Sequence, residues 1–127
     1  MKNYTKIFFT SLILLFLIPI TYQGIKKYFR DKRARYSIGI TNGTHAAGRS
    51  STFTIYFNFF LYGKIIQCDD AYRDYYSPKT KNGRYFVRFD SLHPSNAVLL
   101  QDFPVPDSIK TAPPNGWKEI PVKKPDN

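Results

Sequence analysis

The sequence has little cysteine and little histidine. It contains one cysteine, Cys68, and two histidines, His45 and His93. A single cysteine excludes an intrachain disulfide. Both histidines fall in expected turns, and Cys68 with Asp69 and Asp70 is the only sequence cluster of potential metal ligands. Because this cluster lacks the spacing of known metal sites, we expect no metal and no cofactor.

The sequence also lacks a recognisable catalytic constellation. Cys68 with either histidine could form a nucleophile and base pair, but a lone cysteine that ends a strand is more often a small buried apolar residue. Four aspartates border loops beside arginines, so solvated ion pairs explain them better than paired catalytic carboxylates. They are Asp69, Asp70, Asp74 and Asp90. No glycine-rich phosphate loop is present. We therefore expect that the protein is not an enzyme.

Acidic residues are few: nine stand against 19 lysines and arginines, and the formal net charge is +10. Such an excess of positive charge is typical of proteins that bind nucleic acid, so its position along the chain matters. Residues 1–35 carry eight basic side chains and one acidic one, a net +7, whereas residues 36–127 carry only +3. Most of the excess flanks an apolar segment, where basic residues orient membrane proteins. The charge therefore favours a membrane partner over nucleic acid.

One apolar segment, Ile7 to Ile25, contains no charged side chain over 19 residues. As a helix it would span about 28 Å, close to the thickness of the hydrocarbon core of a bilayer. Pro19 lies late in the segment and would permit a kink near its exit. We predict a transmembrane helix, whose membrane-spanning residues are Ile7, Phe8, Phe9, Leu12, Ile13, Leu14, Leu15, Phe16, Leu17, Ile18 and Ile20.

The alternative reading of this segment is a cleaved signal peptide, which would release a secreted domain. Cleavage requires small residues at the first and third positions before the cut, and a cut after Gly24 would place Tyr22 at the third. We therefore expect an uncleaved anchor. Lys26–Arg35 holds six basic residues, against two on the N-terminal side. The positive-inside rule then predicts a single-pass membrane protein with its C-terminal domain in the cytoplasm.

Residues 36–103 are expected to form a small β-domain between the anchor with its basic flank (residues 1–35) and an irregular tail (residues 104–127). The clearest signal is strict alternation of apolar residues in Ser51–Tyr62, which predicts a strand with one face in the core. Those core residues are Phe53, Ile55, Phe57, Phe59 and Leu61. Tyr62-Gly63 predicts the tight turn of a hairpin. The five expected strands are Tyr36–Ile40, Ser51–Tyr62, Lys64–Cys68, Arg84–Phe89 and Ala97–Leu100.

Turn-forming residues predict two long loops in this domain, Thr41–Ser50 and Asp69–Gly83, the second with one helical turn around Asp70–Tyr75. From Gln101 onward, prolines forbid the interior of a regular sheet. Trp117 is expected to pack the tail back onto the domain. We predict a mainly β fold, either a small five-stranded barrel of the SH3 or OB kind or a curled sheet, preceded by one transmembrane helix.

The segment Gly83–Leu100 (GRYFVRFDSLHPSNAVLL) contains a glycine, alternating residues, an aspartate, a proline turn and a small-apolar pair. This pattern resembles the closing motif of a widespread bacterial domain family of unassigned function. The hairpin Thr54–Ile66, with Gly63-Lys64 as its turn, resembles the hairpin that precedes that motif. The resemblance covers about half of the chain and implies a small β-barrel tethered by a transmembrane helix, without implying an activity. The tail with Asn115-Gly116-Trp117 is similar to small uncharacterised Bacteroidota proteins.

Aromatic residues in outward positions, beside arginines, form a candidate binding surface. Such residues suit a protein interface and can also stack single-stranded bases; alternatively, they fill a second core layer beneath the tail. The aromatics expected to be partly exposed are Tyr56, Phe60, Tyr62, Tyr72, Tyr75, Tyr76 and Phe86. The candidate partner surface is Tyr72, Arg73, Tyr75, Tyr76, Arg84 and Arg88. We expect a non-enzymatic interaction or accessory module whose partners are the lipid bilayer and another protein. The alternatives are a membrane-tethered barrel that binds nucleic acid and a secreted β-domain.

Overall fold

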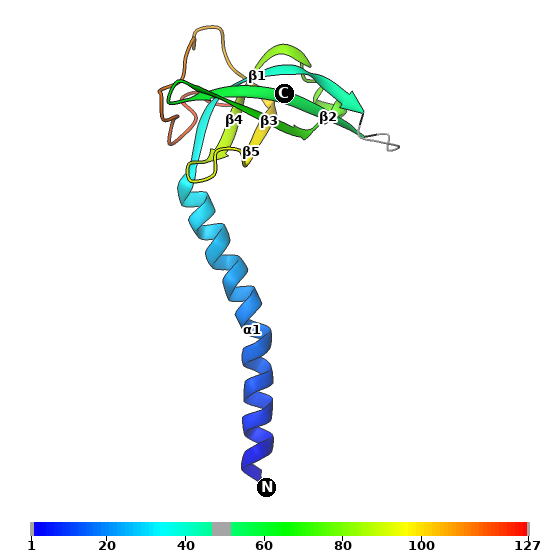
Figure 1. The fold of residues 1–127 in the computed structure, drawn as a ribbon, viewed down its shortest axis with the longest axis vertical. Helices are drawn as coiled ribbons and strands as arrows, with labels where there is room; N and C mark the ends of the chain where they lie inside the picture. The colour runs from blue at the N-terminus through cyan, green and yellow to red at the C-terminus, as the bar shows by residue number, and fades with distance from the viewer. Residues whose placement is uncertain (1, 47–51, 127) are drawn as a thin grey trace. The chain divides into compact units, whose positions relative to one another are not determined.

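A computed structural model describes residues 2–46 and 52–126 of the chain. In this part, one helix is followed by five strands and one short 3-10 turn (Figure 1). The chain divides into two compact units, Met1–Arg33 with the helix and Ala34–Asn127 with the sheet. The elements are α1 (Lys2–Arg33), β1 (Ala34–Ala46), β2 (Phe53–Leu61), β3 (Lys64–Ala71), η1 (Asp74–Tyr76), β4 (Lys81–Asp90) and β5 (Ala97–Pro104).

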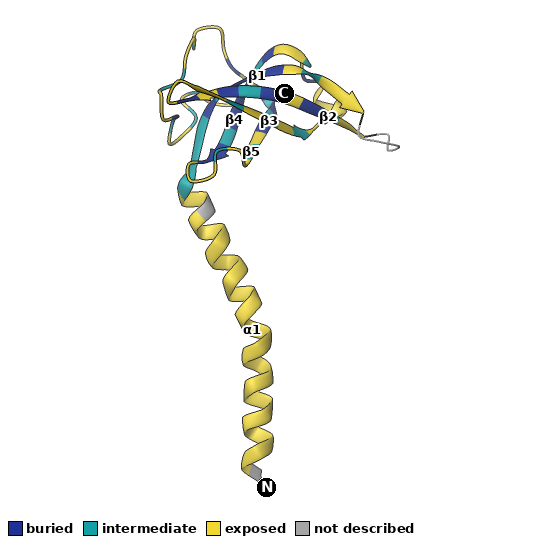
Figure 2. Ribbon diagram, viewed as in Figure 1, coloured by how far each residue is buried: buried dark blue, intermediate teal, exposed yellow. Residues whose placement is uncertain are grey.

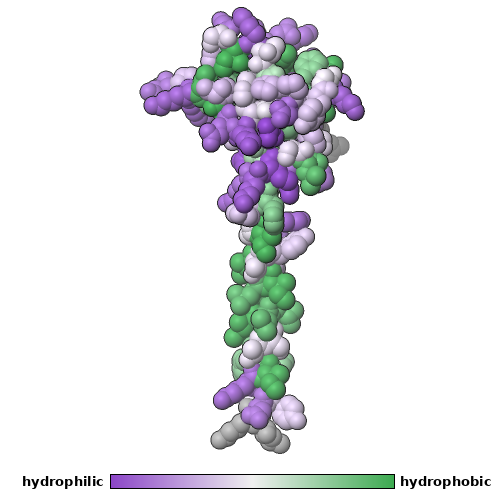
Figure 3. Space-filling model, turned by 90° about the vertical axis from the view of Figure 1, so that its left-hand side faces the viewer, coloured by the Kyte–Doolittle hydropathy of each residue, from purple (hydrophilic) through white to green (hydrophobic). Residues whose placement is uncertain are grey.

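Helix α1 contains the whole predicted membrane segment. It has 32 residues with Pro19 inside it, which corresponds to a length of about 48 Å. It is long and apolar enough to cross a membrane, and its large apolar side chains are exposed. Figure 3 shows a hydrophobic band along the helix with hydrophilic side chains at both ends. The apolar helix is therefore present, and it continues past Ile25 through the basic flank to Arg33.

Polar side chains within this helix are satisfied locally. Thr10, Ser11 and Thr21 donate their hydroxyls to backbone carbonyls about one turn earlier, at distances of 2.6, 2.9 and 2.8 Å. In hydrocarbon, where no water can serve as a partner, an unpaired hydroxyl would cost free energy. These hydroxyls are therefore compatible with an apolar surrounding.

The five strands form one antiparallel sheet in the order β3-β2-β1-β4-β5 (Figure 1). The central strand is β1, which pairs with both β2 and β4. The sheet curls until its edge strands β3 and β5 approach each other, but no backbone ladder joins them within the described residues. The prediction of a mainly β fold with five strands is confirmed, in the form of the curled sheet and not of a closed barrel.

The main core lies on the face that the curl encloses, called here the inner face. Every second residue of β2 from Ile55 onward is buried there, as the alternation predicted, whereas Phe53 remains about half exposed. Gly39 lies at the centre, where an added Cβ would come within 2.4 Å of the Val87 side chain. The buried residues of this core are Ile55, Phe57, Phe59, Leu61, Tyr85, Val87, Phe89 and Leu99.

A second core lies on the opposite face, called here the outer face, where the tail covers part of the sheet (Figure 2). Trp117 fixes the tail, because its backbone exchanges two hydrogen bonds of 2.8 Å with Tyr36. Its ring packs edge-on against Phe86, with centroids 6.0 Å apart. Trp117 thus packs the tail onto the domain, as expected. The expectation that Phe86 is partly exposed is wrong, because this packing buries it completely.

The prediction of a loop over Thr41–Ser50 is wrong for Thr41–Ala46. These residues continue β1 through a bulge between Thr41 and Thr44 and pair with β2. Residues 47–50 of that predicted loop lie outside the described residues. Turn-forming residues here serve a bulge, which bends the strand without ending it.

The second predicted loop, Asp69–Gly83, is shorter than expected at both ends. Its first three residues extend β3 and its last three begin β4, while the helical turn lies at Asp74–Tyr76. Asn82 has a φ of 59° within the strand. The backbone N–H of Gly83 donates to Oγ1 of Thr41 at 2.8 Å. Strand β5 also runs further than expected, to Pro104, a position that an edge strand tolerates.

Candidate functional site

The six residues of the predicted partner surface come from three segments of the chain. The structure places Tyr72 with Arg73 directly after β3, Tyr75 with Tyr76 in η1, and Arg84 with Arg88 in β4.

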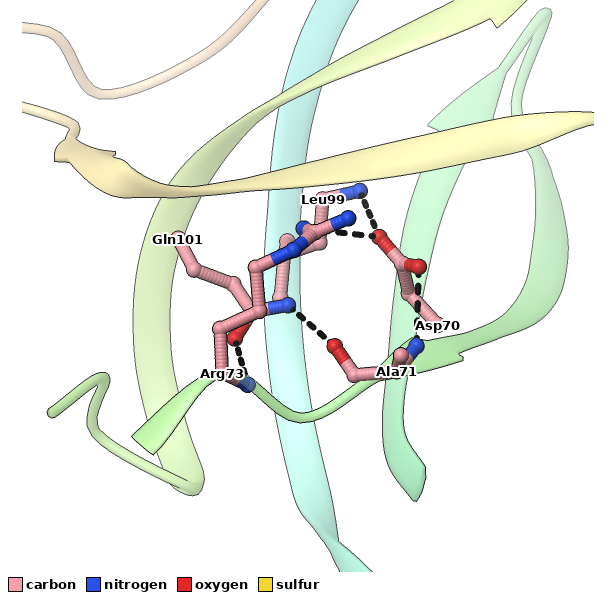
Figure 4. Close-up of polar contacts among 5 residues, drawn as sticks. All are labelled: Asp70, Ala71, Arg73, Leu99 and Gln101. Carbon is pink, nitrogen blue, oxygen red and sulfur yellow. Dashed lines mark hydrogen bonds and ion pairs between the residues drawn. The ribbon is translucent and has the colours of Figure 1, made fainter. Parts of the chain in front are cut away.

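Tyr72 packs against the inner core and edge-on against Phe53, with ring centroids 6.5 Å apart. Arg73 belongs to a polar clasp between the edge strands β3 and β5 (Figure 4). The Asp70 carboxylate accepts hydrogen bonds from the backbone N–H groups of Leu99 and Ala71, at 3.1 and 2.8 Å. The Gln101 side chain donates to the carbonyl of Ala71 at 2.7 Å and accepts from the N–H of Arg73 at 2.8 Å. Nη1 of Arg73 lies 3.7 Å from Oδ2 of Asp70. Side chains thus replace the backbone ladder that is missing between these strands.

The clasp holds the two edge strands together. Gln101 is 2% exposed, and both its amide atoms already have backbone partners. Buried polar groups require such partners, so a ligand would have to displace them. Asp70 forms an ion pair with Arg73, as interpreted from the sequence, and it also accepts two backbone N–H groups. The sequence does contain a signal for the position of Gln101. It lies two residues after Leu99, so the alternation of the strand assigns its side chain to the inner face.

The second pair borders a polar hollow of about 370 Å³ beside Tyr85 and Asp102. The rings of Tyr75 and Tyr76 have centroids 4.2 Å apart, and a hydrogen bond between their side chains, which favours the protonated form of Tyr76, is the main cause that raises the pKa of Tyr76. The Tyr85 hydroxyl accepts a backbone N–H at 2.6 Å, and Asp102 pairs with Lys124 from the tail. Most polar groups of this hollow therefore already have partners within the chain.

Arg84, from the third pair, borders a hollow of about 400 Å³ between the sheet and the tail. We call this hollow the outer-face groove. Its floor comes from β1 and β2 and its wall from the tail, and the lining residues that matter below are Ile38, Ile40, Phe60, Arg84, Lys110 and Pro114.

The apolar surface of the groove continues over the hairpin formed by β2 and β3. Phe60 and Ile65 pair across this hairpin and are 56% and 57% exposed, and Tyr62 at the turn is 69% exposed. The hairpin has the tight turn that Tyr62-Gly63 predicted, with positive φ at both residues. Large apolar side chains gathered on one exposed face, as here, mark interaction sites.

The groove is cationic. Arg84 and Lys110 line it, and none of its lining residues is acidic. Nη2 of Arg84 donates to the carbonyl of Ile109 and, at 3.4 Å, to that of Lys110, so part of the guanidinium is committed to the tail. Lys110 is exposed. Sequence reasoning assigned Arg84 to a partner surface but missed the contribution of Lys110 and Pro114, which it placed in an irregular tail.

The Cys68 thiol donates to the backbone carbonyl of Ser95 at 3.7 Å. Cys68 packs against the inner core, and burial, followed by the neighbouring Asp69 carboxylate, raises the pKa of its thiol. A raised pKa reduces the thiolate fraction and hence the nucleophilicity. His45 and His93 are exposed. Residues 2–46 and 52–126 contain no group of three or more His, Cys, Asp or Glu side chains arranged to hold a metal ion.

Comparisons of the chain with protein-family models, with curated proteins and with solved structures found no match. The resemblance noted in the sequence therefore carries no further weight. Any function has to be argued from the geometry of this chain.

Proposed function

We propose that this protein is a single-pass membrane protein whose β-domain, Ala34–Asn127, is a non-enzymatic interaction module. The observation that carries the proposal is the exposed apolar surface of Ile40, Phe60, Tyr62 and Ile65 on the outer face. The tail covers the other part of that face, so the exposed part is where another protein would add contacts. Surfaces of this kind, rimmed by polar residues, are typical of protein interaction sites.

The anchor part of the proposal is supported by the apolar helix α1 and its basic flank. We propose that the helix is retained uncleaved in the bacterial inner membrane. Carbonate and high salt should then fail to release the full-length protein from membranes, and mass spectrometry should find an intact N-terminus. Release by either treatment would contradict the anchor, and an N-terminus near Gly24 would instead favour a secreted domain.

For sidedness we propose that the β-domain faces the cytoplasm, since the basic cluster Lys26–Arg35 follows the apolar segment. A reporter enzyme pair fused after Asn127 tests this. The cytoplasmic reporter should be active, and the periplasmic reporter silent. Activity of the periplasmic reporter alone would reverse the orientation.

The interaction itself is tested by photo-crosslinking in living cells. A photoreactive phenylalanine analogue at Phe60 should give a discrete protein adduct. The matched control is the same analogue at Tyr75, which is 71% exposed but lies on η1 and does not line the outer-face groove. An adduct at Tyr75 and none at Phe60 would contradict the proposed surface and would favour the surface predicted from the sequence.

A second candidate function, binding of single-stranded nucleic acid, is favoured by two exposed aromatic side chains on the outer face of β2, Tyr56 and Phe60. Partly open five-stranded barrels bind oligonucleotides on such faces. Asp69, the cross-strand neighbour of Tyr56, would repel a phosphate backbone. Full-length protein in detergent should bind labelled single strands with steep salt dependence if this candidate is right. No binding at low salt would exclude it.

A further inference from the structure

We infer that the outer-face groove binds an acidic peptide segment that carries an apolar side chain. This inference rests on the proposed function, because it specifies the chemistry of the partner at the same surface. It follows from three features of the groove: a wall held in place, an apolar floor and an unbalanced positive charge.

The wall of the groove is fixed at both ends by hydrogen bonds to the sheet. At one end, the N–H of Tyr62 donates to the carbonyl of Pro114 at 2.7 Å. At the other, the Arg84 side chain holds the carbonyls of Ile109 and Lys110. Near that end the N–H of Val105 donates to the carbonyl of Arg84 at 2.9 Å. A groove formed before binding costs little ordering entropy when a ligand enters, which favours affinity.

The floor of the groove suits an apolar side chain. Ile38 and Ile40 come from the central strand, and Phe60 comes from its neighbour β2. Ile40 is 41% exposed, so part of its surface is free to be covered. The volume of about 400 Å³ lies within the range of ordinary ligand sites. Filling it with an apolar group would remove this surface from water, which supplies the main favourable free energy.

The charge of the groove selects an acidic partner. Arg84 and Lys110 are the charged residues of its lining, and Lys110 has no ion-pair partner within residues 2–46 and 52–126. Carboxylates placed at this rim would form charge-assisted hydrogen bonds, whereas a basic partner would be repelled. Two cations are a poor match for nucleic acid, which needs several cations along its backbone.

The test uses full-length protein in detergent micelles and a labelled heptapeptide in which glutamates alternate with leucine and phenylalanine. Fluorescence anisotropy should show saturable binding. Two control peptides separate the two requirements: one has lysine in place of glutamate, and the other has serine in place of leucine and phenylalanine. Neither control should bind. Equal binding of the lysine peptide, or of a labelled single-stranded oligonucleotide, would overturn the inference.

Two pairs of matched variants locate the site. Lys110→Glu should weaken binding of the acidic peptide at least tenfold, roughly the loss of one charge-assisted contact. Lys118→Glu changes the net charge equally at another exposed tail lysine outside the groove lining, and should leave affinity unchanged. Ile40→Ser should also weaken binding, whereas Val98→Ser, at 44% exposure outside the groove, should not. Equal effects within either pair would overturn the inference.

Failure of this inference and failure of the proposed function give different results. If the Phe60 adduct forms in cells and persists in the Lys110→Glu variant, the outer face binds a partner without the groove chemistry described here. If no adduct forms at Phe60 and the peptide does not bind, both the inference and the interaction surface are wrong.

Discussion

The two faces of β2 carry similar side chains that have different environments. Phe57 and Phe59 point to the inner face and are 0% and 1% exposed, whereas Tyr56 and Phe60 point to the outer face and are 41% and 56% exposed. Aromatic content alone does not separate them. The difference lies in what covers each face: the curl of the sheet encloses one, and the tail covers only part of the other (Figure 2). The same strand therefore contributes stability on one face and an open surface on the other.

The largest expected effect on the free energy of unfolding comes from replacing a phenylalanine of the inner face, compared with one of the outer face. Phe57→Ala should lower the free energy of unfolding by about 3–5 kcal/mol, because it removes a fully buried ring and leaves a cavity. Phe60→Ala should change it by about 0.5 kcal/mol or less. Denaturant unfolding of the detergent-solubilised protein, followed by the fluorescence of Trp117, measures both. Equal losses would show that the outer face of β2 is also part of the core.

Removal of the tail's main contact should have the next largest effect. Trp117→Ala should cost about 2–3 kcal/mol, below the full range for a buried ring because Trp117 is only partly buried. The tail should also become more sensitive to limited proteolysis, since its packing against Phe86 is lost. Tyr75→Ala is the control, as an exposed aromatic. A tail equally protected in both variants would contradict the role of Trp117.

The clasp should contribute less than either core. Gln101→Ala leaves the carbonyl of Ala71 and the N–H of Arg73 without their partners, which should cost about 1–3 kcal/mol. Gln67→Ala, at an exposed position of β3, should have almost no effect. Amide hydrogen exchange should also accelerate in β3 and β5 of the Gln101→Ala variant alone. Unchanged exchange would mean that these edges are held together by other contacts.

The smallest effect concerns Cys68 and pH. Its thiol has a raised pKa in the folded chain, so the unfolded chain loses this proton first as the pH rises. The contribution of the Cys68 thiol to the free energy of unfolding is therefore complete below the pKa that this thiol has in the unfolded chain. It is lost as the pH rises through the pKa of the thiol in the folded chain. The wild type should lose slightly more stability than Cys68→Ser at alkaline pH. Asp69→Asn should shift the pH profile of thiol alkylation downward, because it removes the second cause of the raised pKa. An unshifted profile would leave burial as the sole cause.

The sequence was sufficient to predict those elements whose pattern depends on neighbouring residues alone. Strict alternation identified β2 and four of its five expected core residues, and the charge-free run identified α1, because both patterns depend only on neighbouring residues. Thr41–Ala46 and Asp69–Ala71 were assigned to loops because they are rich in turn-forming residues. In the structure they pair with β2, and this long-range pairing overrides their local preference.

The outer-face groove depends on contacts that no local pattern encodes. Arg84 was recognised as an outward-facing residue, but its bonds to Ile109 and Lys110 depend on the path of the tail. That path has no regular periodicity, because it is set by prolines and by the contact of Trp117 with the sheet. The clasp was missed for a related reason, since it forms only when the curl brings β3 and β5 together.

The most direct test of the central claim is to compare hydroxyl-radical labelling of the two exposed aromatic regions in native membranes and in liposomes of the same lipids that contain only this protein. Any protection by lipid is the same in both preparations. We predict that Phe60 and Tyr62 are labelled less in native membranes than in liposomes, while Tyr75 and Tyr76 are labelled equally. Equal labelling of Phe60 and Tyr62 in both preparations would contradict the claim that the outer face binds a partner.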